Sequence, residues 1–176
     1  EFRNTSDINI KNNSNATFYY DSYIDSYLHI TDNSTVDFNE KLEIFDDSGL
    51  FPVIEQDNDF SGGTLSLDNS TLDIKKEAKF IGTNVLINHS TATIDNLVDY
   101  RSKIYVVNDS ELEINKNASF DEGTHLIVKD DSNATINGAL GVTDSGTIEF
   151  VNGEYVVNNG GIKIDKSNLN VEGEAN

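Results

Sequence analysis

The sequence predicts an all-β protein that forms a single right-handed parallel β-helix, or β-solenoid, with three short strands in each coil of about 20–22 residues. Three observations support this fold class. A serine recurs at a nearly constant interval, apolar residues alternate with polar ones on both sides of it, and no helical stretch separates the alternating segments. We therefore expect short strands that each turn one face toward a shared core, in coils stacked about 4.8 Å apart.

The repeat becomes visible when the chain is aligned on one serine that follows a polar turn rich in Asn and Asp. The serines of this column are Ser14, Ser34, Ser70, Ser90, Ser110, Ser132 and Ser167. Four of the six steps between them are 20–22 residues long, and the other two, of 36 and 35 residues, indicate an insertion or a missing copy. A fixed period in this range is typical of repeat architectures.

Each unit contains apolar pairs with one residue between the two members, which is the period of a β-strand. The first strand precedes the serine and contains the pairs Leu28/Ile30, Leu65/Leu67, Val85/Ile87, Ile104/Val106 and Leu126/Val128. The second strand follows the serine and contains Val36/Phe38, Leu72/Ile74, Ala92/Ile94, Leu112/Ile114 and Ala134/Ile136. A third strand follows in most units, at Ala78/Phe80, Ala118/Phe120 and Leu140/Val142. Strands this short, about three to five residues, fit a solenoid coil and not a meander of long antiparallel strands.

The corner between the first and second strands carries the motif "DNST" twice, at 32–35 and 68–71. Asn and Asp tolerate left-handed backbone angles and hydrogen-bond their own backbone in tight turns. The serine recurs at this corner, so we expect its hydroxyl to lie over the hydroxyl one coil away. We interpret the column as a structural ladder of Ser34, Ser70, Ser90, Ser110 and Ser132. The nine N-x-S/T sequons of the chain are also explained largely by these corners, and they permit glycosylation without requiring it.

Two stretches depart from the repeat. Residues 45–63 form a predicted loop insertion that contains the only proline, Pro52, and that could carry binding. The acid pairs Asp46/Asp47 and Asp57/Asp59 of this insertion could hold Ca²⁺ through oxygen ligands, although "DNDFSGG" matches an EF-hand loop only loosely. After residue 143 the corner serine is missing and the strand register is open. The alternating pairs continue there at Ile148/Phe150, Tyr155/Val157, Ile162/Ile164 and Leu169/Val171.

Composition limits the partners of the protein. The 12 Lys and Arg residues against 31 Asp and Glu give a formal net charge of −19. A surface this acidic repels nucleic acid and anionic membranes, so we expect no nucleic-acid partner, and no apolar run is long enough for membrane insertion. The absence of Cys excludes disulfides and Cys-ligated metal sites. We expect one solenoid domain over 1–176 that is a segment of a longer protein.

Two groups of side chains are candidate contact residues. Tyr19, Tyr20, Tyr23 and Tyr27 are four of the seven tyrosines in the chain. They could stack on sugar faces or cover the first coil. Leu86, Tyr105 and Ile127 take the outward position of the first strand in three consecutive coils. An apolar stripe on an acidic rod indicates either an interface or a surface that the insertion covers.

The sequence offers no catalytic constellation. His29, His89 and His125 fall at different places in the repeat unit, and the recurring serines lie at corners rather than beside a histidine. Acidic residues are so frequent that a glycosidase-type carboxylate pair cannot be recognised among them. We therefore expect no enzyme activity, no catalytic residue, no resident metal and no cofactor, apart from the Ca²⁺ that the insertion could bind.

The unit Ile104–Phe120 resembles the coils of secreted microbial adhesins, the β-helical passenger domains of autotransporter and two-partner-secretion proteins. This resemblance implies an extracellular rod on a microbial cell surface that attaches to host or neighbouring cells through a surface receptor or a glycan. The alternative is a carbohydrate-binding or polysaccharide-degrading solenoid that could depend on Ca²⁺, because fold alone does not decide function. The lyases that share this fold typically place basic residues over an acidic polymer, and here the few basic residues are spread along the chain.

Overall fold

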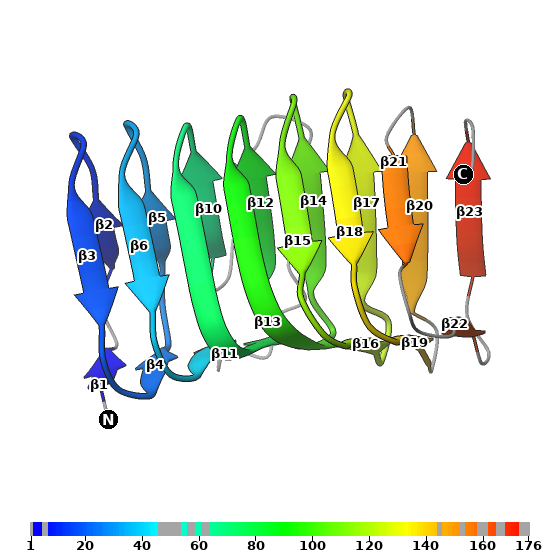
Figure 1. Cartoon of the computed structure of the whole chain (residues 1–176), viewed down its shortest axis with the longest axis horizontal. Coiled ribbons are helices and arrows are strands. Elements are labelled where there is room, and N and C mark those ends of the chain that lie inside the picture. The colour runs from blue at the N-terminus through cyan, green and yellow to red at the C-terminus, as the bar shows by residue number, and fades with distance from the viewer. Residues whose placement is uncertain are drawn as a thin grey trace.

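A computed structural model of the protein describes residues 2–4, 7–45, 54–55, 59–60, 64–143, 146–151, 154–157, 162–164 and 168–172. These residues contain strands and turns but no helix, and their parallel strands stack as a β-solenoid (Figure 1). Each coil ascends on the far side, descends on the near side and returns along the bottom as the chain advances, which makes the solenoid right-handed. The predicted fold class is confirmed.

The first strands of the coils form one parallel sheet, which we call the first face. Its eight strands are, in spatial order, β2 (Ile8–Ile10), β5 (Leu28–Ile30), β10 (Thr64–Asp68), β12 (Asn84–Asn88), β14 (Lys103–Val107), β17 (His125–Lys129), β20 (Thr147–Val151) and β23 (Asn168–Glu172). The spatial order is also the chain order, so each coil adds one strand beside the previous one.

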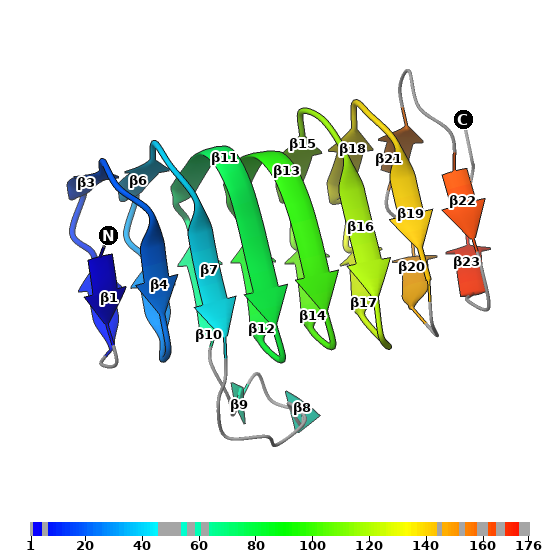
Figure 2. The same cartoon turned by 90° about the horizontal axis from the view of Figure 1, so that it is seen from below.

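A larger parallel sheet wraps around the other two faces. The second face contains β3 (Asn15–Phe18), β6 (Thr35–Phe38), β15 (Glu111–Ile114), β18 (Asn133–Ile136) and β21 (Glu154–Val157). The third face contains β1 (Phe2–Asn4), β4 (Ser22–Ile24), β7 (Leu42–Phe45), β16 (Ala118–Asp121), β19 (Leu140–Val142) and β22 (Ile162–Ile164). Two further strands, β11 (Thr71–Ile81) and β13 (Thr91–Tyr100), run through both faces (Figure 2).

These two strands differ from the expected length of about three to five residues, because they contain 11 and 10 residues. In their coils the corner between the second and third faces bends the chain without ending the strand. The pairing of β11 with β13 only shifts its register between Ile74 and Glu77. A bulge of this kind absorbs an extra residue and increases the local bend, so one strand can serve two faces.

The register that the sequence left open after residue 143 follows from the pairing. β20 pairs with β17 on the first face, β21 with β18 on the second, and β22 with β19 on the third. β23 then returns to the first face beside β20. The repeat therefore continues through the region without the corner serine, whereas Ser167 lies outside the described residues.

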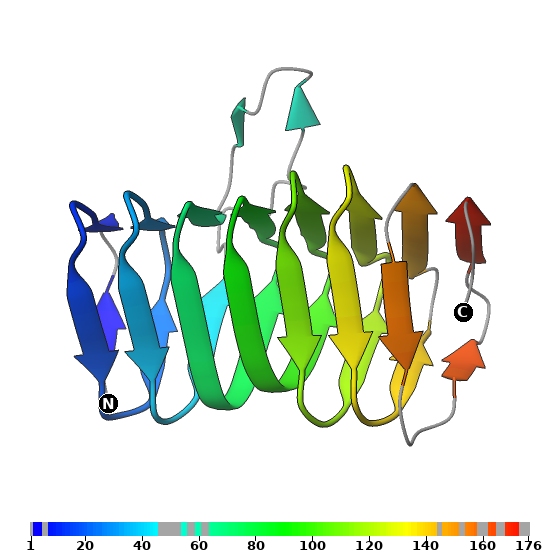
Figure 3. The same cartoon turned by 45° about the horizontal axis from the view of Figure 1, so that its top comes forward.

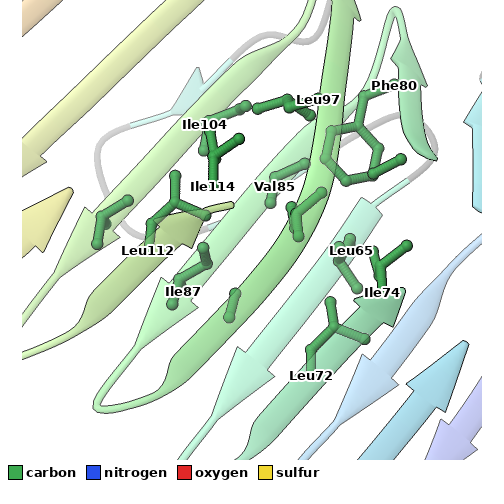
Figure 4. Close-up of a cluster of buried hydrophobic side chains, with 14 of the residues drawn as sticks. Leu65, Leu72, Ile74, Phe80, Val85, Ile87, Leu97, Ile104, Leu112 and Ile114 are labelled. Atoms are coloured by element: carbon green, nitrogen blue, oxygen red, sulfur yellow. The ribbon is translucent and has the colours of Figure 1, made fainter. Parts of the chain in front are cut away.

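The core is made of the inward members of the predicted apolar pairs. Leu65 lies in register between Leu28 and Val85, and Val85 is in turn followed by Ile104. Each of these side chains is at most 2% exposed. Figure 4 shows the equivalent side chains of neighbouring coils pointing into the same interior. One continuous core therefore runs along the stack, as expected where each coil contacts only its neighbours.

The insertion after β7 contains two short described strands, β8 (Ile54–Glu55) and β9 (Asp59–Phe60). They pair with one another in the antiparallel sense and form a separate two-stranded sheet. Figure 3 shows this hairpin standing apart from the stacked coils. The rest of 46–63 and the side chains of the predicted Ca²⁺ ligands lie outside the described part of the chain.

The turn between β18 and β19 has no room for a side chain at Gly138. A Cβ atom there would lie 2.3 Å from the carbonyl oxygen of Lys116 and 2.6 Å from Oδ1 of Asn117. We expect Gly138→Ala to lower the free energy of unfolding by about 1–3 kcal/mol, because the clash is with backbone that must move. Gly141→Ala is the matched control, since its nearest contact would be 4.0 Å away. Equal urea denaturation midpoints for the two variants would contradict this packing.

Candidate functional site

The outward column at the centre of the first face contains the predicted apolar stripe. Leu86 of β12 lies in register with Tyr105 of β14, and Tyr105 lies in register with Ile127 of β17. Adjacent strands are about 4.8 Å apart, so the three side chains form a continuous row. All three are half-buried. The structure therefore brings these three candidate residues together in one outward column of the first face.

The first face also differs from the second face in charge. Its central outward column carries one carboxylate residue, in the order Asn9, His29, Ser66, Leu86, Tyr105, Ile127, Glu149 and Asn170. The corresponding column of the second face carries three, in the order Thr17, Asp37, Asp73, Thr93, Glu113 and Thr135. In a chain with a net charge of −19, the apolar stripe therefore lies in the less acidic of these two columns.

The carboxylates of the second face repel one another. Partial burial raises the pKa of Asp73, the nearby Lys75 opposes this shift, and the negative charges of Asp37 and Asp95 raise the pKa further. Lysines also flank the stripe of the first face. Lys103 precedes Tyr105 by two positions on β14, and Lys129 follows Ile127 by two positions on β17. A negatively charged partner is therefore repelled less by the first face than by the second.

The four N-terminal tyrosines do not form one cluster. Tyr19 and Tyr20, in the turn between β3 and β4, are 68% and 69% exposed. Tyr23 takes an outward position on the third face, in register with Glu43. The ring of Tyr27 stacks on that of His29, with 5.6 Å between the ring centroids. Tyr27 therefore lies against the first face, whereas the other three occupy other parts of the coil.

The ladder serines use their hydroxyls within the fold. The backbone N–H of Ser34, Ser70, Ser90 and Ser110 each donates to the Oγ of the serine in the next coil, over 3.3, 3.0, 3.2 and 3.0 Å. We expected each serine hydroxyl to lie over the hydroxyl of the next coil. The observed hydrogen bond instead joins the backbone N–H of one serine to the hydroxyl oxygen of the next. Ser70 and Ser90 also donate their own hydroxyl protons to the carbonyls of Asp68 and Asn88. These hydroxyls are thus committed to structure.

The sequence reasoning missed one buried acid, Asp99. Its position on β13 lies in register between Phe80 and Phe120 in an inward column, and the residue is 0% exposed. Neither carboxylate oxygen has a hydrogen-bond partner, because the Ser102 hydroxyl donates to the carbonyl of Tyr100 instead. Burial raises the pKa of Asp99 to about 8, against weaker opposing effects of the nearby Ser102 hydroxyl and Tyr100 backbone. Asp99 is therefore mostly protonated at neutral pH.

A signal for Asp99 exists in the repeat itself. The third strand of its coil aligns Leu97/Asp99 with Ala78/Phe80 and Ala118/Phe120, so an acid replaces a phenylalanine at a core position. A search for apolar pairs misses this strand because one member of its pair is an acid. Aligning equivalent positions of the repeat units identifies it. The carboxyl has no contact with solvent and lies away from the stripe, so we assign it a role in stability.

The histidines remain apart in the structure. His29 stacks on Tyr27, His89 lies at a corner, and His125 lies on the first face. Among the described residues no three His, Cys, Asp or Glu side chains are grouped to hold a metal ion. The part of the chain that the structure describes also has no helix long and apolar enough to cross a membrane.

No protein-family model, no curated protein and no solved structure shows significant similarity to this chain.

Proposed function

We propose that this solenoid is a non-enzymatic adhesin segment on a microbial cell surface, and that its first face attaches to a receptor on host or neighbouring cells. The observation that carries the proposal is the apolar row of Leu86, Tyr105 and Ile127 on the outer side of the first face, in a chain with a net charge of −19. Apolar rows on a solvated sheet face are typical of contact surfaces. The resemblance of the repeat to adhesin coils supports the same role.

The stripe has the composition of an interface centre. Tyrosine is enriched among residues that dominate binding energy, and Leu86 and Ile127 provide the apolar surroundings that exclude water from it. The lysines at the ends of β14 and β17 form a polar rim. This arrangement suits a receptor that presents an apolar contact patch bordered by carboxylates or neutral polar groups.

A binding role is favoured over catalysis by how the polar side chains are used. The ladder serines are buried and bonded within the stack, and the histidines lie far apart in the repeat. A hydrolytic site needs a nucleophile, a base and a stabilising donor that converge on one point. We found no such convergence among the described residues.

Tyr105→Ser is expected to weaken binding of the purified chain to cells by about tenfold or more, because a hot-spot tyrosine contributes over 1 kcal/mol. Binding is measured by flow cytometry on a panel of animal epithelial cells and microbial cells. Tyr100→Ser, a half-buried tyrosine on the third face, is the matched control and should bind as the wild type does. The melting temperature of Tyr105→Ser should remain close to that of the wild type.

Two results would overturn the proposal. If Tyr105→Ser lowers the melting temperature and leaves cell binding intact, the stripe is covered core and not an interface. If the chain binds no cell type and turns over a polysaccharide, the protein is an enzyme. Turnover is measured as release of reducing ends from a panel of neutral and acidic polysaccharides.

A further inference from the structure

The corners between the first and second faces are not equally long. Four of them contain two successive residues with left-handed backbone angles: Asn12–Asn13, Asp32–Asn33, Asn108–Asp109 and Asp130–Asp131. Two consecutive coils contain a single one, Asn69 or His89. The last inward apolar residue of their first strands, Leu67 or Ile87, lies three residues before the ladder serine, whereas this distance is four residues in the other coils. Two short corners therefore lie side by side between longer ones.

A surface groove of about 270 Å³ lies at these short corners. Its polar side chains come from Asn33, Asn69, Thr71, His89 and Thr91, and the ladder serines of the same coils lie beneath them. We call it the corner groove. Thr71 and Thr91 are neighbours in register, and the backbone N–H of Asn33 donates to the carbonyl of Asn69. The lining residues thus form rows that continue from one coil to the next.

The lining side chains retain free hydrogen-bonding capacity. Asn33, Thr71, His89 and Thr91 make no side-chain hydrogen bond to any described residue. Amides and hydroxyls can both donate and accept, so the groove offers both kinds of partner to a ligand. The serines beneath add none, because their hydroxyls are already bonded in the ladder.

No side chain that lines the groove is a carboxylate, lysine or arginine, in a protein with 31 acidic residues. Without carboxylates it does not suit a hard metal cation. Without basic side chains, and with a net charge of −19, it does not attract an anion. Its polar lining does not suit an apolar ligand. A ligand that is uncharged and rich in hydroxyl groups avoids all three mismatches, since it is neither a cation nor an anion and it is polar.

His89 departs from the residue pattern of the corners. The left-handed residue before the ladder serine is otherwise Asn or Asp, at Asn13, Asn33, Asn69, Asp109 and Asp131. Asn and Asp adopt left-handed angles at the lowest cost among residues with a side chain, so the corner itself does not require an imidazole. The His89 ring is exposed at the groove, where it can donate or accept a hydrogen bond.

We propose that the corner groove binds a single unit of a neutral saccharide, with Asn33, Asn69, Thr71, His89 and Thr91 as its hydrogen-bonding residues. The volume lies just below the range of about 300–1,000 Å³ that is typical of small-molecule sites, which fits one sugar unit and not a longer ligand. The inference does not rest on the first face, because none of the stripe residues lines the groove.

The test uses the full chain labelled with ¹⁵N and a panel of methyl glycosides: glucose, galactose, mannose, fucose, N-acetylglucosamine and N-acetylgalactosamine. Methyl glucuronide serves as the charged probe. We expect at least one neutral glycoside to shift the amide resonances of residues 69–71 and 89–91, with a millimolar Kd, and glucuronide to bind more weakly.

Two variants and one control assign the binding to the groove. Thr71→Val with Thr91→Val keeps the β-branched shape and removes both hydroxyls, and we expect it to weaken binding by about tenfold. His89→Asn keeps a residue suited to the left-handed corner and should weaken binding by about threefold or more. Thr35→Val, in the same column one coil earlier and outside the groove lining, should bind as the wild type does.

The proposal is overturned if no neutral glycoside shifts these resonances, if glucuronide binds more tightly than every neutral glycoside, or if the double valine variant binds like Thr35→Val. The melting temperature of each variant shows whether it is folded. Should the double variant unfold, His89→Asn alone decides. Tyr105→Ser should leave glycoside binding unchanged, so failure of the cell-adhesion proposal and failure of this one give different results.

Discussion

Asp99→Asn is expected to stabilise the protein by several kcal/mol at pH 8 and by much less near pH 5. Asparagine has nearly the shape of the protonated carboxyl and is also uncharged, so it resembles the form that the wild type buries. The wild type loses stability as pH rises because the buried carboxyl is 0% exposed and has no hydrogen-bond partner for its charged form.

The direction of this dependence follows from the two pKa values. The pKa of Asp99 is about 8 in the folded protein and 3.8 for an ordinary Asp. Between these values the folded chain holds a proton that the unfolded chain has released. The stabilising contribution is therefore fully present below about pH 4 and is lost as pH rises toward about 8. Each pH unit within this window changes the free energy of unfolding by about 1.4 kcal/mol.

The measurement compares urea denaturation of the wild type and Asp99→Asn at several pH values between about 5 and 8.5. The lower limit avoids Asp95, whose pKa is held below its ordinary value by the Lys116 ammonium group 2.7 Å away and whose contribution is lost toward acid pH. Asp109→Asn, at an exposed corner, is the control. It also removes one carboxylate, so it shows how much a lower net negative charge alone changes the free energy of unfolding. A difference between wild type and Asp99→Asn that stays constant over this range would show that the carboxyl does not change its ionisation there.

Much of the fold could be predicted because every coil of the solenoid needs the same pattern of inward apolar residues and the same corner residues. Alternation follows from the geometry of a single strand, so pairs such as Leu65/Leu67 and Val85/Ile87 indicate their strands without any tertiary information. The corner serine was recognisable for the same reason. Its actual partner, the backbone N–H of the neighbouring serine, was not, since that depends on how two corners lie against each other.

The features that were missed depend on contacts between coils. β11 is long because a bulge in its pairing with β13 lets the strand continue around the corner. No residue type in either strand predicts this bulge. The short corners at Asn69 and His89 are visible as a missing residue in the sequence, but the groove between them depends on how neighbouring corners lie against each other. The outward row of Leu86, Tyr105 and Ile127 could be predicted because all three occupy the same position in the repeat.

Ser110→Leu is expected to lower the free energy of unfolding by about 2–6 kcal/mol. Ser110 is 2% exposed, and its Oγ accepts the backbone N–H of Ser90 over 3.2 Å. Leucine removes that acceptor and leaves a buried N–H unsatisfied, at a cost of about 1–3 kcal/mol. Its larger side chain must also enter a filled corner, which adds about 1–3 kcal/mol. The melting temperature should fall by on the order of 10 °C.

Two further variants separate these causes. Ser110→Ala removes the acceptor without adding volume, so it should show only the first cost of about 1–3 kcal/mol. Ser14→Leu places the same residue in the same column at an exposed serine, whose N–H keeps its bond to the Oγ of Ser34. Because no described N–H donates to the Oγ of Ser14, we expect a change within about 0.5 kcal/mol. Equal melting temperatures for Ser110→Leu and Ser14→Leu would mean that the serine hydroxyls do not hold the coils together, and the stacked apolar columns would then carry the stability alone.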